Sequence, residues 1–144
     1  MSQLQFLNFT FSFTSIYIVI SIFVAIVIWM GGNKLISTKG KMPNSTWFYL
    51  GSTLETLWFF VSGTILYFVE MSPIYKVVPV VYMIYSLYGW IYVTRLISTN
   101  EIPNSAEDII IPKPYIEYSQ AFAMVFLLLC IGLLVLPWVA PQLI

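Results

Sequence analysis

Long apolar stretches alternate with short polar segments along the chain, and this pattern predicts four membrane-spanning helices. Each stretch has about 18 to 24 residues, which is long enough as a helix to cross a hydrocarbon layer of roughly 30 Å. The stretches are Phe11–Met30, Trp47–Val69, Val77–Thr94 and Tyr115–Trp138. The polar segments between them are too short to hold another domain. We therefore predict an all-α, polytopic integral membrane protein, with residues 1–144 forming a single four-helix bundle.

The composition supports a membrane protein and excludes several kinds of chemistry. Hydrophobic residues make up 60% of the chain and charged residues only 8%, which is too little polar surface to cover a water-soluble domain. The chain has no histidine and one cysteine, Cys130, so it cannot supply histidine-ligated haem or an iron–sulfur cluster. We expect no catalytic residue, no metal site and no cofactor bound by this chain alone, and no nucleic-acid surface. Cys130 lies within the fourth stretch, where we expect a packed thiol.

The basic residues predict how the helices are oriented. Five of the six lie in the segments after the first and third stretches: Lys34, Lys39, Lys41, Arg95 and Lys113. Only Lys76 follows the second stretch. Because cytoplasmic loops carry an excess of Lys and Arg, we expect a multi-pass protein of the plasma membrane with both termini outside.

A repeated sequence connects the two halves of the chain. The segment "LISTKGKMPNS", from Leu35 to Ser45, resembles "LISTNEIPNS", from Leu96 to Ser105. The Pro-Asn-Ser of each copy is expected to end the loop and cap the next helix. Two interpretations stay open. Either residues 11–69 and 77–138 are a duplicated helical hairpin, two parallel repeats related by an axis close to the membrane normal, or similar positions at the membrane surface produced similar loops.

Glu55 is the residue with the clearest functional interest. It lies about 12 Å along a helix from Trp47, and an ionised acid at mid-membrane costs about 2.5–3.5 kcal/mol, so such acids usually face a helix contact or a water path. Small residues at Gly51, Ser52 and Ser62 share its side of the helix and allow another helix to approach. Glu55 is therefore either a protonated hydrogen-bonding group between helices or a proton-handling carboxyl at the cytoplasmic mouth of a path.

A second glutamate, Glu117, occupies a related position in the other half of the chain. It follows a proline-rich lead and lies one turn after Lys113, so a place at the membrane surface is its simpler explanation. We name Glu55, Ser52 and Glu117 as candidates for a proton path.

The third stretch is rich in aromatic residues, as "VYMIYSLYGWIY" shows. Its tyrosine hydroxyls could line a polar path or contact a quinone. The simpler interpretation is packing together with anchoring at the membrane interface.

Residues 11–70 resemble the two-helix membrane anchor of cytochrome and quinol oxidase subunit II. The second helix of that family typically contains Leu-Glu-x-x-Trp-Thr-x-x-Pro. Three positions match this motif: Leu54, Glu55 and Trp58. Phe59 and Ser62 replace the threonine and the proline, and a second hairpin follows where the family has its copper-binding outer domain. The resemblance implies that Glu55 lies at the cytoplasmic entrance of a proton pathway into the catalytic subunit.

Two classes of function follow from these observations. The first is a non-catalytic subunit of a respiratory membrane oxidoreductase, above all a haem–copper terminal oxidase, which packs on a larger membrane-embedded catalytic subunit and contributes to proton entry. Haem and copper are then expected in the partner subunit, and this chain takes part in electron transport only through the complex. The alternative is a small carrier or channel built from a duplicated hairpin, or an accessory subunit of another membrane enzyme complex.

Overall fold

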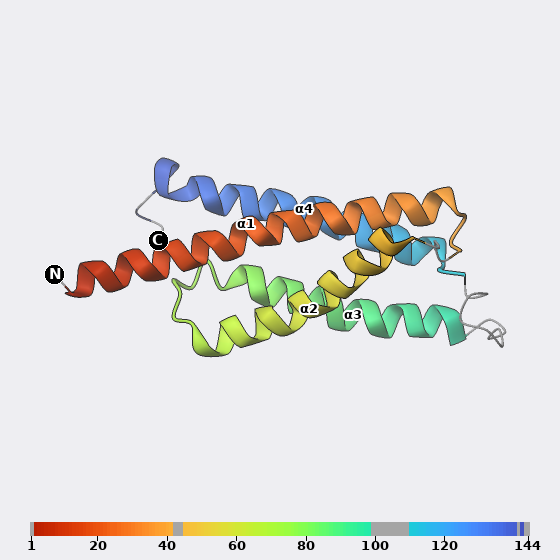
Figure 1. Ribbon diagram of the computed structural model, residues 1–144, viewed down its shortest axis with the longest axis horizontal. Coiled ribbons are helices and arrows are strands. Elements are labelled where there is room, and N and C mark those ends of the chain that lie inside the picture. Colours follow the sequence, from red (N-terminus) through yellow and green to blue (C-terminus); the bar gives the residue numbers. More distant parts are fainter. Residues whose placement is uncertain (1, 42–44, 99–109, 141, 143–144) are drawn as a thin grey trace.

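The computed structural model describes residues 2–41, 45–98, 110–140 and 142, and the helices of this part form one elongated bundle (Figure 1). The helices are α1 (Ser2–Ser37), α2 (Thr46–Phe68), α3 (Val77–Ser98) and α4 (Lys113–Val139). Within the described ranges the only β-type pairing is an isolated bridge between Lys41 and Ile110. The prediction of an all-α protein is confirmed.

Three of the four helices are long and apolar enough to cross a membrane. These segments are Phe13–Ser37, Val77–Arg95 and Lys113–Val139. Large apolar side chains also point outward from the bundle, as expected of a protein that lies in lipid. The helix α2 begins and ends within a residue of the predicted second span but is not among these segments, because Glu55 and several serines and threonines interrupt its apolar sequence.

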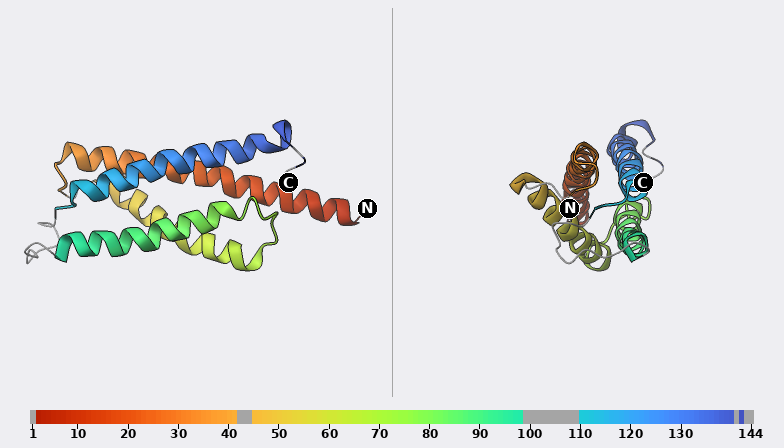
Figure 2. Two further views of the ribbon diagram at one scale, coloured as in Figure 1. Left: turned by 180° about the vertical axis from the view of Figure 1, so that it is seen from behind. Right: turned by 90° about the vertical axis from the view of Figure 1, so that its right-hand side faces the viewer.

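Successive helices run in opposite directions, so α1 and α3 point the same way (Figure 1). The α1–α2 and α3–α4 connections therefore lie at one end of the bundle, called the connection end below, and α1 begins and α4 ends at the other. The closest packing joins α1 to α4. The helix α2 is inclined to the other three, as the two views of Figure 2 show. The duplicated hairpin and the orientation in the membrane stay predictions.

Backbone contacts hold the two connections together at this end. The N–H of Ile111 donates a hydrogen bond of 2.7 Å to the carbonyl oxygen of Gly40. Gly40 has φ +88°, and a Cβ there would lie 2.5 Å from the Ile111 carbonyl oxygen, so only glycine fits. Ser45 is the N-cap residue of α2, as predicted, but its side chain forms no capping hydrogen bond. The second Pro-Asn-Ser, residues 103–105, lies outside the described residues, and the prediction that it caps the next helix is wrong, because α4 begins at Lys113 with Pro112 as its N-cap residue.

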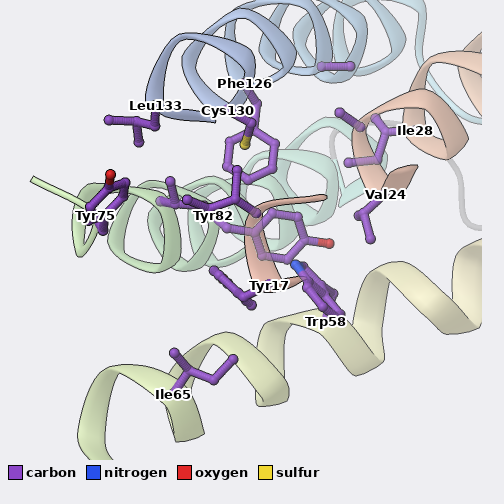
Figure 3. Packing of buried hydrophobic residues seen from close by; sticks show 14 of the residues in the cluster. Tyr17, Val24, Ile28, Trp58, Ile65, Tyr75, Tyr82, Phe126, Cys130 and Leu133 are labelled. Atoms are coloured by element: carbon purple, nitrogen blue, oxygen red, sulfur yellow. The ribbon is translucent and has the colours of Figure 1, made fainter. Parts of the chain in front are cut away.

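Aromatic and aliphatic side chains fill the bundle interior (Figure 3). Tyr82 of α3 and Phe126 of α4 are completely buried, and so is Cys130, which confirms the predicted packed thiol. On the α1–α2 side, the rings of Tyr17 and Trp58 stack with their centroids 5.2 Å apart. The Tyr17 hydroxyl and Ser62 Oγ share a hydrogen bond of 2.6 Å, and Trp58 Nε1 donates to Ser21 Oγ at 3.1 Å.

Candidate functional site

A cavity of about 110 Å³ lies between α2, α3 and α4. Its lining residues are Ser52, Glu55, Thr56, Tyr82, Tyr85, Ser86, Gly89, Trp90 and Tyr115. They come from the first half of α2, the central part of α3 and the start of α4. The cavity therefore lies in the central part of the bundle and extends toward the connection end, where α4 begins.

Glu55 supplies the only carboxyl group of the cavity wall. The residue is half-buried, and its carboxyl forms no hydrogen bond or ion pair with any residue that the structure describes. Its backbone is held instead, since the Tyr82 hydroxyl donates a 2.7 Å hydrogen bond to the Glu55 carbonyl oxygen. The carboxyl thus has hydrogen-bonding capacity that no described residue uses.

The cavity has a buried floor and an exposed rim. Tyr82, Ser86 and Gly89 form its buried part on α3, whereas Ser52 and Thr56 on α2 are exposed. The Thr56 hydroxyl donates to the Ser52 carbonyl oxygen at 3.2 Å, so its own helix satisfies it. The hydroxyl-bearing side of α2 therefore borders the open side of the cavity.

Ring contacts between α3 and α4 fix the far wall of the cavity. Tyr85 stacks on Phe122 with centroids 3.7 Å apart and on Tyr118 at 5.4 Å. The Tyr118 hydroxyl also donates a 3.1 Å hydrogen bond to the Tyr85 carbonyl oxygen. These contacts fix the position of the Tyr85 ring, which also lines the cavity.

Beyond Tyr82 the interior is filled by side chains. The Tyr82 ring packs on Phe126 with centroids 5.6 Å apart, and Cys130 and Val78 are buried in the same cluster. Figure 3 shows Tyr82, Phe126 and Cys130 among the side chains that pack between the helices. The cavity is thus a pocket that enters the bundle from one half, and the packed core closes it at Tyr82.

The structure brings two of the three candidate residues together. Glu55 and Ser52 line the same cavity. Glu117 does not line it: its side chain is 66% exposed and lies 3.9 Å from the Lys113 ammonium, at the surface position that was its simpler explanation.

Three residues that line the cavity were not predicted as site residues: Thr56, Ser86 and Tyr115. The spacing of Tyr82, Ser86 and Gly89 at i, i+4 and i+7 is a signal for one face of a helix. Tyr82 and Tyr85 of α3 pack against aromatic side chains of α4 and also line the cavity. Whether their hydroxyls belong to a polar path stays a prediction. Tyr115 lines the cavity only because of the way α4 packs, and no pattern in the sequence predicts this.

The wall of the cavity contains one carboxyl group together with serine, threonine and tyrosine hydroxyls. No group of three or more histidine, cysteine, aspartate or glutamate side chains that could hold a metal ion occurs within the described part of the chain. Comparisons of the sequence with family models and curated proteins, and of the fold with solved structures, found no match.

Proposed function

We propose that the chain is a non-catalytic integral membrane subunit of a respiratory oxidoreductase, specifically a haem–copper terminal oxidase. In this proposal Glu55 helps to deliver protons to the larger catalytic subunit, which carries the haem and the copper. The observation that carries the proposal is the Glu55 carboxyl, which lies at a hydroxyl-lined cavity without a partner among the described residues. The resemblance of the Leu54-Glu55-x-x-Trp58 motif to oxidase subunit II supplies the class of partner.

The cavity has the size and chemistry that proton transfer to a carboxyl requires. Since a water molecule occupies about 30 Å³ in the liquid, a volume of about 110 Å³ accommodates roughly three. Serine, threonine and tyrosine hydroxyls can each donate and accept a hydrogen bond, so they can orient such waters toward Glu55. A packing role alone would instead place the carboxyl against a hydrogen-bond partner on another helix.

The continuity of the helices favours a subunit over a carrier. Carriers typically bind their substrate near the membrane midplane at interrupted helices. Here α3 runs unbroken through Pro79 and Gly89, and α2 and α4 run unbroken through Gly63 and Gly132. The packed core beyond Tyr82 also argues against a channel through this chain.

The exposed polar side chains of α2 further support a contact with a partner protein. The helix α2 is not among the three helices that are long and apolar enough to cross a membrane. On its surface, the polar side chains of Ser52, Thr53 and Thr56 are exposed, together with Leu57. Polar and small side chains are favoured where transmembrane helices meet. We propose that α2 is the fourth span and that it lies against the catalytic subunit in the plasma membrane, with the connection end facing the cytoplasm and both termini outside.

Purification from native membranes tests the assembly. The chain should co-purify in mild detergent with a haem-bearing membrane protein, and the fraction should show the haem spectrum. A colourless preparation that contains only this chain would contradict the oxidase proposal.

The same complex tests the role of Glu55. Glu55→Gln keeps the shape of the side chain but removes the exchangeable proton, so oxygen consumption and proton uptake per haem should fall while assembly persists. Glu117→Gln is the matched control and should leave both rates unchanged, because Glu117 is exposed beside Lys113. Unchanged turnover in Glu55→Gln would leave Glu55 with a structural role only.

A further inference from the structure

The donor atoms around the cavity are oxygens. Besides the Glu55 carboxyl, its wall contains the hydroxyl-bearing residues Ser52, Ser86 and Tyr115, and no lysine or arginine lines it. Hard cations such as Na⁺ and K⁺ prefer oxygen ligands of this kind, whereas transition metals prefer nitrogen and sulfur.

The single negative charge of the cavity wall, when Glu55 is ionised, favours a monovalent cation. Glu55 provides one negative charge, which balances one positive charge. A divalent ion would leave an uncompensated charge within the membrane, where the desolvation penalty is several kcal/mol per ion.

The volume of the cavity favours a small ion that keeps part of its hydration shell. About 110 Å³ holds an ion together with two or three of its waters, at roughly 30 Å³ per water. The exposed Ser52 and Thr56 at the rim give such an ion a polar route to Glu55.

We propose that this cavity binds a monovalent inorganic cation, Na⁺ or K⁺, in competition with the proton on Glu55. The exchange is balanced: the cation binds to the carboxylate, and the proton of the carboxylic acid leaves to water. Glu55 supplies the charged ligand, and Ser86, buried on α3, supplies a neutral one. The inference rests on the proposed proton exchange at Glu55 and adds to it a cation that regulates that exchange.

Thermal unfolding of the purified full chain tests the inference without any partner subunit. The chain is unfolded in NaCl, in KCl and in choline chloride at equal ionic strength. A ligand that binds only the folded state raises Tm, so we expect at least one inorganic cation to raise Tm by about 2 °C or more over choline. Glu55→Gln should abolish this difference, Ser86→Ala should reduce it, and Glu117→Gln should retain it.

Two outcomes would overturn the cation site. One is the same Tm in all three salts; the other is a salt-specific shift that persists in both Glu55→Gln and Ser86→Ala. If Glu55→Gln does not fold, Ser86→Ala decides the matter alone, because removing one hydroxyl preserves the packing. A positive shift together with unchanged oxidase turnover in Glu55→Gln would keep the cation site and remove the proton-delivery role of Glu55. The same Tm in all three salts together with reduced turnover would remove the cation site and keep proton delivery.

Discussion

Among single residues, the glutamates in the first halves of α2 and α4 show how different surroundings separate similar sequence positions. Glu55 lies half-buried at the cavity, whereas Glu117 is exposed beside Lys113. The sequence predicted that Glu55 has the greater interest, because an acid deep in an apolar stretch is costly. It could not predict Tyr115 as a neighbour of Glu55, because that depends on how α4 is rotated against α2 and α3.

Tyr82 and Tyr75 provide a matched pair of tyrosine hydroxyls. Tyr82 donates to the Glu55 carbonyl oxygen, whereas the buried Tyr75 hydroxyl has no hydrogen-bond partner within the described part of the chain. We expect Tyr82→Phe to lower the free energy of unfolding by about 0.5–2 kcal/mol, the range for hydrogen bonds within membranes. The measurement is thermal or denaturant unfolding of the purified chain.

Tyr75→Phe serves as the control for the lost hydroxyl. Tyr75 lies in the turn between α2 and α3, and burial raises the pKa of its hydroxyl above the usual value. Removing a buried hydroxyl without a partner should leave stability unchanged or raise it. Equal destabilisation by both substitutions would show that the Tyr82 hydrogen bond contributes nothing specific.

At the scale of the helices, the apolar stretches located all four, but the helix ends differ from the predicted spans. The first helix begins at Ser2, well before the predicted span at Phe11, since hydropathy marks the membrane-embedded part of a helix rather than its full length. The pairing of α1 with α4 was not predictable, because the contact depends on side chains from the two ends of the chain. Gln120 of α4 illustrates it: its Nε2 donates to the Trp29 carbonyl oxygen at 3.1 Å and to Asn33 Oδ1 at 2.9 Å.

Gly32 allows this α1–α4 contact, and its substitution tests it. A Cβ at Gly32 would lie 2.6 Å from Gln120 Cγ. Gly32→Ala should therefore displace Gln120 from both hydrogen bonds and lower the free energy of unfolding by about 0.5–2 kcal/mol. In the control, Gly132→Ala, the added Cβ meets nothing within 4 Å, so stability should be unchanged or rise through better helix propensity. Similar Tm values for the two variants would contradict the proposed packing at Gln120.

At the scale of the whole molecule, the cavity and the packed core divide the bundle into two halves. The half toward the connection end contains Glu55 and the hydroxyl-bearing wall, whereas the other half is filled around Phe126 and Cys130. Alternating helix directions and short connections were predictable from four apolar stretches. The cavity was not, because its wall comes from three helices and depends on how α2, α3 and α4 pack together. The division suits a protein that receives protons at one end and passes them to a neighbour.

The central claim is that Glu55 exchanges protons with water through this cavity. A carbodiimide that dissolves in the membrane reacts with protonated carboxyl groups, and mass spectrometry of the resulting peptides locates the adduct. In membranes that contain the full chain, we expect labelling at Glu55 at a rate that falls as the pH of the medium rises and the carboxyl ionises. Absence of an adduct at Glu55, or a labelling rate that does not change with pH, would contradict the claim.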